Sequence, residues 1–167
     1  MFKAVTIFSL GMDPGGETLF IVLKEIEGEQ MLPIWIGLLE ATAIVSEIEG
    51  LKYSRPMTHD LLKGIIDKTD SKVNRVEICD LKDNTYYALV HLTNRDKVLS
   101  IDSRPSDAIA LALRSQAPIF VSEELLIKYK QIETTQESVP ADKSEQGKKW
   151  ENILEKLKPE DFGKYKM

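Results

Sequence analysis

The chain of 167 residues has one cysteine, few aromatic residues and no long uninterrupted apolar run. Cys79 cannot form an internal disulfide, and its place in an apolar segment favours a buried thiol over a nucleophile. The longest mainly apolar stretch, residues 31–48, is interrupted by Glu40 and Glu47, whereas a bilayer-spanning helix needs about 20 predominantly apolar residues. We therefore expect no membrane span. No small-residue cleavage pattern follows the N-terminus, so the sequence predicts a cytoplasmic protein.

Several well-known site motifs are also missing. There is no Gly-rich phosphate loop, no cysteine-based zinc pattern and no nucleophile elbow. The net charge of −5 argues against broad, non-specific adhesion to nucleic acid, because that mode relies on many Lys and Arg contacts to phosphate. It does not exclude a local site at which divalent cations neutralise the phosphates.

What the sequence does contain is an internal repeat with an offset of 67 residues. Glu40 begins an acid-Ala-x-Ala-aliphatic pattern that recurs at Asp107 (107 − 40 = 67), and the apolar run 19–23 matches the run 86–90. Each half has three strand-like segments followed by a helix. This order predicts an α+β fold with duplicated β3-α units and a mostly antiparallel sheet, which can curl into a barrel with helices outside. The expected strands are 2–10, 18–26, 30–36, 73–81, 85–92, 97–102 and 118–121.

Composition divides the chain into three parts. Residues 1–130 form the expected domain, since the apolar periodic segments all lie there. Residues 131–149 have almost no apolar side chains and indicate a flexible polar linker. Within 150–167, apolar residues recur at helical spacing from Trp150 onwards, which predicts an amphipathic helix that docks on this domain or on a protein partner.

The richest cluster of charged residues lies where a predicted strand meets a helix, in the segment Asp102 to Asp107. Asp102 ends the strand, Asp107 lies in the first helical turn and Arg104 stands between them. Paired carboxylates can hold Mg²⁺ or Mn²⁺, and an arginine can stabilise charge on a phosphoryl group. An Asp-Arg ion pair that only fixes the corner explains the same residues equally well.

A second cluster surrounds the predicted start of a helix at about Thr58. Arg55, His59 and Asp60 bring a guanidinium, an imidazole and a carboxylate together, which suits a metal or phosphate site. The simpler interpretation is that Thr58 caps the helix and Asp60 complements its dipole.

Long motifs in the chain closely resemble the bifunctional nuclease family of bacteria and plants, formerly a domain of unknown function. The resemblance covers about residues 1–130 and implies an α+β fold, hydrolysis of both DNA and RNA, and self-association, most simply as a homodimer. The motifs that carry it are LPIWIG (32–37), RPMTHDLL (55–62), IDSRPSDAIALALR (101–114) and APIFV (117–121). The motif positions that bear charge are Glu40, Arg55, His59, Asp60, Asp102, Arg104 and Asp107.

Together these observations lead to the hypothesis of a metal-dependent phosphodiesterase. Asp102 and Asp107, with Asp60 or Glu40, would bind Mg²⁺ or Mn²⁺. Arg104 or Arg55 would bind the substrate and stabilise the phosphorane-like charge, and His59 would be a metal ligand or general base. The repeat gives Asp102 and Arg104 no charged counterparts, so a single active site is expected at the second corner, with Glu40 as its structural echo. The alternative is a non-catalytic regulatory module that binds an anion or a protein partner.

Overall fold

The computed structural model describes residues 1–12, 18–95 and 97–127. The sequence predictions for the linker 131–149 and the helix 150–167 lie outside these residues. The described elements are β1 (Phe2–Met12), β2 (Leu19–Glu25), β3 (Met31–Ile36), α1 (Leu38–Ile48), α2 (Thr58–Lys68), β4 (Ser71–Lys82), β5 (Thr85–Asn94), β6 (Lys97–Ser103), α3 (Pro105–Ser115) and β7 (Ile119–Ser122), followed by a helical turn at 123–127.

The expected repeat of three strands and a helix is present. Helix α1 spans residues 38–48, and adding 67 to both ends gives 105–115, the bounds of α3. The hairpins differ in register, however. Ile21 in β2 faces Ile34 in β3, whereas Ala88 in β5, the equivalent of Ile21, faces Ser103 in β6 instead of Ile101. The second hairpin is therefore offset by two residues, which keeps the same faces inward because side chains alternate along a strand.

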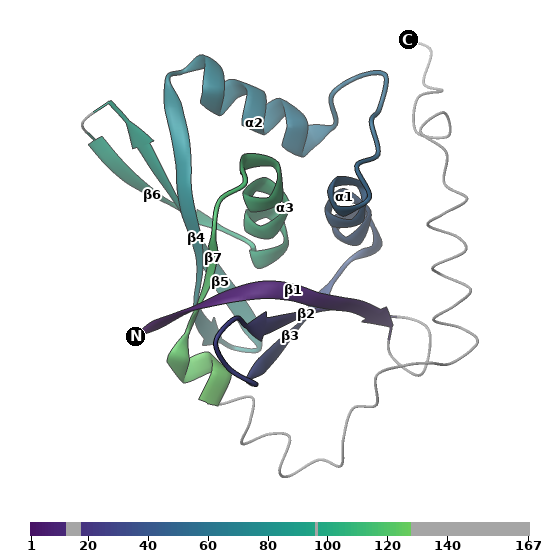
Figure 1. Cartoon of the computed structure of the whole chain (residues 1–167), viewed down its shortest axis with the longest axis vertical. Coiled ribbons are helices and arrows are strands. Elements are labelled where there is room, and N and C mark those ends of the chain that lie inside the picture. The colour runs from purple at the N-terminus through teal and green to yellow at the C-terminus, as the bar shows by residue number, and fades with distance from the viewer. Residues whose placement is uncertain (13–17, 96, 128–167) are drawn as a thin grey trace.

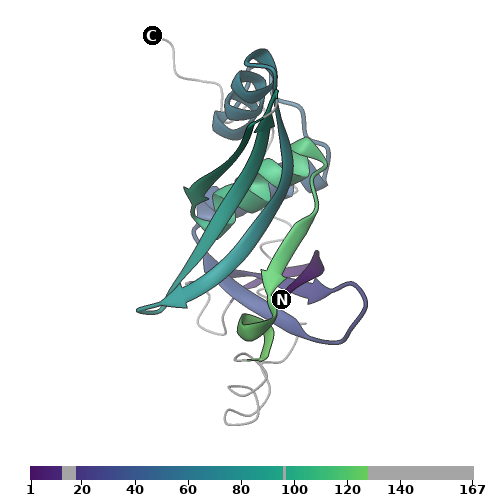
Figure 2. The ribbon, with the colours of Figure 1, turned by 90° about the vertical axis from the view of Figure 1, so that its left-hand side faces the viewer.

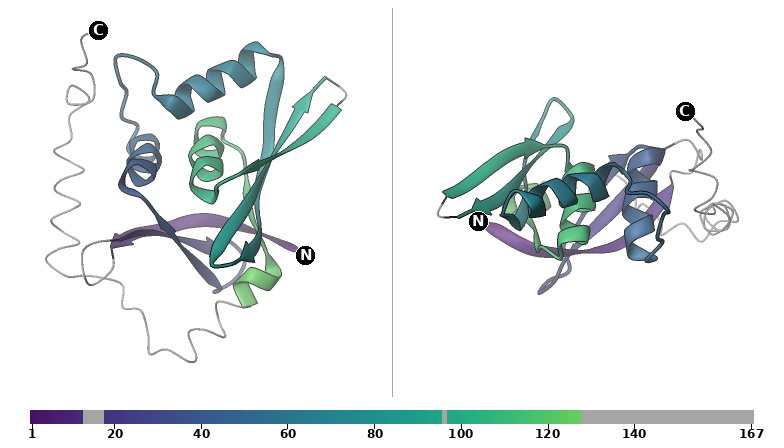
Figure 3. Two further views of the ribbon diagram at one scale, coloured as in Figure 1. Left: turned by 180° about the vertical axis from the view of Figure 1, so that it is seen from behind. Right: turned by 90° about the horizontal axis from the view of Figure 1, so that it is seen from above.

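The seven strands form one sheet in the order β3-β2-β1-β7-β4-β5-β6. All neighbouring pairs are antiparallel except β4 and β7, which run parallel. The last strand, β7, thus lies between the two repeats and pairs with the first strand of each. In Figure 1 β1 crosses the view while β4 runs along the long axis, and Figure 3 shows the same bend from behind and above.

The sheet is open, so the prediction of a barrel was wrong. Closure would require β3 to pair with β6, but these strands stand at opposite ends of the order. Figure 2 shows the strands β4, β5 and β6 curving around the helices instead of closing on themselves. The physical reason is that the helices cover the apolar face of the sheet. In a closed barrel, the strands on the opposite side would cover that face.

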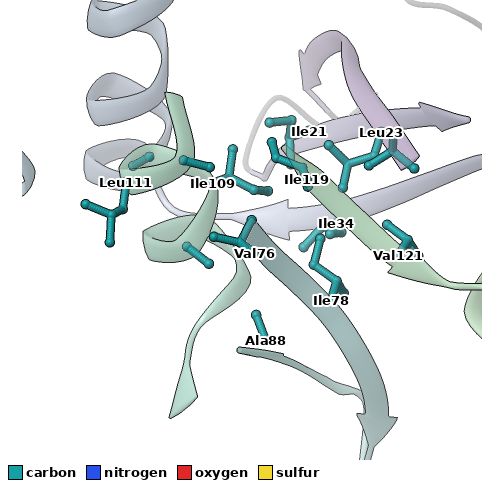
Figure 4. Packing of buried hydrophobic residues seen from close by; sticks show 14 of the residues in the cluster. Ile21, Leu23, Ile34, Val76, Ile78, Ala88, Ile109, Leu111, Ile119 and Val121 are labelled. Carbon is teal, nitrogen blue, oxygen red and sulfur yellow. The ribbon is translucent and has the colours of Figure 1, made fainter. Parts of the chain in front are cut away.

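The helices also do not all lie on the outside, as the barrel prediction required. Seven of the eleven residues of α3 are buried, from Pro105 to Ala112, and α3 contacts α1, α2, β4 and β5. Its small residues allow this close approach, since alanines alternate with Ile109 and Leu111. Figure 4 shows Ile109 beside inward-facing residues of both repeats, such as Ile21 and Val76, whereas Leu111 extends from the opposite side of α3. The core is therefore a single one shared by both halves.

Two chain reversals use residue types that tolerate a positive φ angle. Asp83 and Asn84, the tight turn between β4 and β5, have φ values of 47° and 60°, as a type I′ hairpin requires. Gly50 has φ 65° just after α1, in the left-handed conformation in which a glycine commonly ends a helix. Within the described ranges, no helix has the length and apolar character needed to cross a bilayer.

Candidate functional site

The N-terminal turns of α1, α2 and α3 carry most of the charged residues that the sequence analysis singled out. Glu40 lies in the first turn of α1, His59 and Asp60 in that of α2, and Asp107 in that of α3. Arg104 occupies the N-cap position of α3, with Pro105 as its first helical residue, the place where a proline is tolerated. Helix α3 packs against both α1 and α2. Side chains that are far apart in the sequence therefore lie close together at the N-terminal ends of these helices.

Arg104 joins the two acidic residues that the repeat had matched. Its Nε donates to Asp107 Oδ2 at 2.7 Å, and its Nη1 donates to Glu40 Oε1 at 2.9 Å. Glu40 is thus part of the same cluster and not a separate echo of it. Gly37 leaves room for this arrangement, because a Cβ there would lie 2.4 Å from Glu40 Oε2. The Arg104 side chain is 65% exposed, so its guanidinium can reach a ligand in solvent.

His59 binds the other oxygen of Asp107, with 3.0 Å between Nε2 and Oδ1. Burial raises the pKa of Asp107, but the hydrogen bonds from Arg104 and His59 outweigh it and hold that pKa below its ordinary value. An ionised carboxylate only accepts hydrogen bonds, so Nε2 of His59 carries the proton. The unprotonated Nδ1 of neutral His59 is then available as an acceptor, and among the described residues it has no partner.

Asp60 belongs to a second part of the cluster, which is centred on the buried Arg114. Its Oδ2 accepts the backbone N–H of Met57 at 2.9 Å, which caps α2 in place of the predicted Thr58 hydroxyl. Its Oδ1 accepts from Nε of Arg114. Burial raises the pKa of Asp60, but the hydrogen bonds from Arg114 and Met57 lower it by more. The pKa of Asp60 is therefore below its ordinary value.

Arg114 is the important residue that the sequence analysis missed. Its side chain is only 5% exposed, and its Nη1 donates to the carbonyl oxygens of Ala43 and Ala110 at 3.0 Å each. One guanidinium thus ties α1, α2 and α3 together. A signal was present in the sequence: the small residues of α1, such as Ala43 and Ser46, leave space for a long side chain from the facing helix.

Two predicted site residues lie outside this cluster. Asp102 faces Leu89 across the β5–β6 ladder, whereas the next residue, Ser103, faces the buried Ala88. Because neighbouring residues of a strand point to opposite faces, Asp102 lies on the side of the sheet away from the helices. Arg55 is exposed in the loop before α2 and makes no side-chain hydrogen bond or ion pair within the described part of the chain.

The carboxylates as arranged do not form a ready metal site. Within residues 1–12, 18–95 and 97–127, no group of three or more His, Cys, Asp or Glu side chains is placed to hold a metal ion. The oxygens of Asp107 are already bonded to Arg104 and His59, and Asp60 is bonded to Arg114. The residues therefore fit a hydrogen-bonded charge network better than a preformed Mg²⁺ or Mn²⁺ centre.

Comparison with known proteins gives the family context of this network. The profile of the bifunctional nuclease domain matches residues 21–134, which include all the charged residues above. An uncharacterized protein found in two strains of Mycobacterium tuberculosis is 35% identical over 145 residues, covering 85% of this chain and 87% of its own length.

Plant proteins match over a shorter share of their length. Bifunctional nuclease 1 of Arabidopsis thaliana is 30% identical over 75% of this chain and 40% of its own length. Bifunctional nuclease 2 of Oryza sativa subsp. japonica is 32% identical over 63% of this chain and 34% of its own length. The match to the domain profile covers more than half of the chain, and it agrees with the long motifs and with the repeated α+β architecture. The chain belongs to the bifunctional nuclease domain family.

Proposed function

We propose that this protein is a nuclease that hydrolyses phosphodiester bonds of DNA and RNA at the cluster of Glu40, His59, Arg104 and Asp107. The observation that supports it most is the His59–Asp107 pair with Arg104 beside it. An imidazole whose Nε2 is held by a carboxylate and whose Nδ1 is unprotonated is arranged as a general base. The names of the plant relatives point to the same activity, although this chain spans less than half of their length.

In the proposed reaction each residue has one task. Nδ1 of His59 removes a proton from water, which attacks the phosphorus atom while the bond to the leaving oxygen breaks. The leaving oxygen then takes up the proton from His59, which regenerates the neutral imidazole. Asp107 fixes the orientation of the imidazole and stabilises the imidazolium that forms, as the carboxylate does in other His-Asp pairs. Arg104 stabilises the negative charge that develops on the phosphoryl oxygens, and the exposed Arg55 assists in binding the substrate.

A requirement for Mg²⁺ or Mn²⁺ is a separate proposal. No step above is assigned to a metal, because the described carboxylates are engaged with arginine and histidine. Glu40 is the carboxylate most easily freed to bind a metal, since within the described residues a single hydrogen bond, to the exposed Arg104, holds it. A metal that enters with the substrate phosphate would then be bound by Glu40. Glu40→Gln is expected to raise the concentration of Mg²⁺ or Mn²⁺ needed for cleavage without abolishing it.

The test is cleavage of short end-labelled single-stranded DNA, double-stranded DNA and RNA by the full chain, with Mg²⁺, with Mn²⁺ and with a chelator. We expect Asp107→Asn and His59→Gln to lower the cleavage rate about 100-fold or more, the usual contribution of general-base catalysis. Asp67→Asn is the matched control, because it removes the same charge from an exposed ion pair with Lys63 on α2.

Thermal melting of each variant separates lost catalysis from lost folding. Wild-type protein that cleaves no substrate under any of these conditions would exclude the proposal. Retention of full cleavage by a folded Asp107→Asn variant would show that the activity comes from a contaminant or from another site.

The second candidate is a non-catalytic module that binds an anion or a partner protein. It is favoured by one observation: nearly every charged group in the cluster already has an oppositely charged partner, as a structural network would. This candidate predicts that nucleic acid is not cleaved, whether or not filter-binding assays detect a complex with it. Any partner bound through residues 150–167 would be lost on deletion of that segment.

A further inference from the structure

A second constellation of chemically active groups lies on the other face of the sheet, away from the helices. Glu77 in β4, His91 in β5 and Ser100 in β6 come from three neighbouring strands. Nε2 of His91 lies 2.8 Å from Glu77 Oε2, and Nδ1 of His91 lies 3.0 Å from Ser100 Oγ. The order carboxylate, imidazole, hydroxyl is that of the catalytic triads of serine hydrolases.

The strand pairing explains how distant residues meet here. His91 is the direct cross-strand partner of Ser100 on one side and of Arg75 on the other. Directly opposite residues of an antiparallel pair have Cβ atoms only about 5 Å apart and project from the same face. Glu77 is two residues from Arg75 and therefore points to that face too. The row of Glu77, His91 and Ser100 therefore follows from the register of strands β4, β5 and β6 and does not depend on the conformation of a loop.

Proton positions in this row follow from the charge of Glu77. Burial raises the pKa of Glu77, but hydrogen bonds from Arg75 and His91 outweigh it, so its pKa is below the ordinary value. The ionised carboxylate accepts from Nε of Arg75 at 2.7 Å on one oxygen and from His91 on the other. In the neutral form of His91, Nε2 therefore carries the proton and Nδ1 can only accept. The hydroxyl of Ser100 must then be the donor.

The exposure of the side chains to solvent increases from Glu77 and His91 to Ser100, as a nucleophile that must reach its substrate requires. The side chains of Glu77 and His91 are 9% and 12% exposed, whereas Ser100 is exposed. The carboxylate-imidazole pair is thus shielded from water, and only the hydroxyl faces solvent. Ser100 also lies on the edge strand β6, and edge strands leave backbone N–H groups free to donate to an oxyanion.

We propose that Ser100 is an activated nucleophile, with His91 as its general base and Glu77 as the residue that positions His91, and that it reacts with small carboxylic esters. Oγ of Ser100 bonds to the carbonyl carbon while its proton passes to Nδ1 of His91. The ester C–O bond breaks, and the leaving alkoxide takes that proton. Water then attacks the acyl-serine, gives a proton back to Ser100 through His91, and releases the carboxylic acid. No oxidant, reductant or metal is needed.

The experiment treats the full chain with a fluorophosphonate probe, which forms an Oγ–P bond and releases fluoride, and follows hydrolysis of p-nitrophenyl acetate in parallel. Peptide mass mapping is expected to find one adduct, at Ser100. Ser100→Ala should abolish labelling, and His91→Gln should slow it about 100-fold. Ser103→Ala is the matched control on the same strand, because Ser103 bonds only to a neighbouring backbone carbonyl.

A second measurement avoids any change to the buried residues. Ser100→Cys and Ser103→Cys are alkylated with iodoacetamide, and the cysteine beside His91 should react at least about tenfold faster, because an imidazole promotes thiolate formation. Equal rates, or probe labelling that persists in Ser100→Ala, would overturn the proposal and leave the row a structural clamp. His59→Gln should leave labelling unchanged, so the fate of this site is separable from that of the nuclease.

Discussion

Arg114 illustrates how much one side chain contributes when it is buried with a charge. Its guanidinium satisfies the Asp60 carboxylate and two backbone carbonyls at once, and solvent cannot replace it because only 5% of the side chain is exposed. Removing the buried guanidinium leaves the partly exposed Asp60 carboxylate and two backbone carbonyl oxygens without their donor. The three-helix arrangement that holds the cluster of Glu40, His59, Arg104 and Asp107 therefore depends on a residue outside that cluster.

Arg114→Met is expected to lower the free energy of unfolding by about 3 kcal/mol, the lower range for breaking a buried ion pair. Urea denaturation followed by circular dichroism measures it. Lys72→Met, at an exposed position of β4, is the control and should change stability by about 0.5 kcal/mol or less. A loss below about 1 kcal/mol in Arg114→Met would mean that water satisfies the freed groups after all.

Asp102 and Asp107 carry the same functional group on opposite faces of the structure, and this separates their expected roles. Because Asp102 points away from His59 and Arg104, we expect Asp102→Asn to cleave nucleic acid within about twofold of the wild-type rate, far from the 100-fold general-base effect. Parallel kinetics of Asp102→Asn and Asp107→Asn measure the difference. Equal losses in both variants would place the active site elsewhere than at the helix cluster.

At the scale of elements, two glycines test the local rules that end and sustain the helices. Gly50 follows α1 with φ 65°, and Gly64 lies inside α2; a Cβ at either position meets nothing within 4 Å. Gly50→Ala should therefore cost about 1 kcal/mol through backbone strain alone. Gly64→Ala should stabilise by about 1 kcal/mol, because alanine is the better helix former.

Thermal unfolding of both glycine variants gives the comparison directly. The opposite signs are the essential point, since the two substitutions add the same methyl group to equally open surroundings. Destabilisation by both variants would indicate that α2 needs Gly64 for contact with a partner that this chain alone does not provide.

The order of elements was predictable from the sequence, whereas the path of the sheet was not. Alternation of apolar residues and the turn residues Asp83 and Asn84 define β4 and β5 locally, so the predicted strands 73–81 and 85–92 lie within the observed ones. The position of β7 depends on pairing between residues far apart, such as Phe2 with Ser122, which no local pattern records. The barrel was predicted because strand alternation alone does not show whether strands or helices cover the apolar face.

The candidate site was predictable to a similar extent. The repeat located Glu40 and Asp107 as equivalent positions, but not the guanidinium of Arg104 that lies between them. The approach of His59 to Asp107 spans 48 residues and depends on how α2 crosses α3. The row of Glu77, His91 and Ser100 required the strand register, which periodicity does not fix.

For the molecule as a whole, three hydrogen-bonded carboxylates with lowered pKa values make stability dependent on pH. Asp60, Asp107 and Glu77 have folded pKa values below the ordinary 3.8, 3.8 and 4.5. Above those ordinary values, the groups are ionised in both states and contribute their full stabilisation. As the pH falls through the lower folded values, the native carboxylates also protonate and the stabilisation disappears.

We therefore expect the free energy of unfolding to fall between about pH 5 and about pH 3, with a shallower decline in Asp107→Asn. Urea titrations at several pH values measure both slopes. A slope in the variant as steep as that of the wild type would show that Asp107 does not contribute to the acid sensitivity. Self-association, which the family resemblance implies, stays a prediction that sedimentation velocity over a range of concentrations tests.

The central place of β7 has a consequence for how the protein is made. The ribosome synthesises both three-stranded units before it reaches residues 119–122, yet each unit can complete its sheet only by pairing with that strand. Until then, β1 and β4 each present an unpaired edge, which is the kind of surface that aggregates. The nascent chain thus keeps two incompletely paired sheets until β7 has been synthesised. A chain truncated shortly before residue 119 is expected to be degraded by proteases and not to fold into a smaller domain.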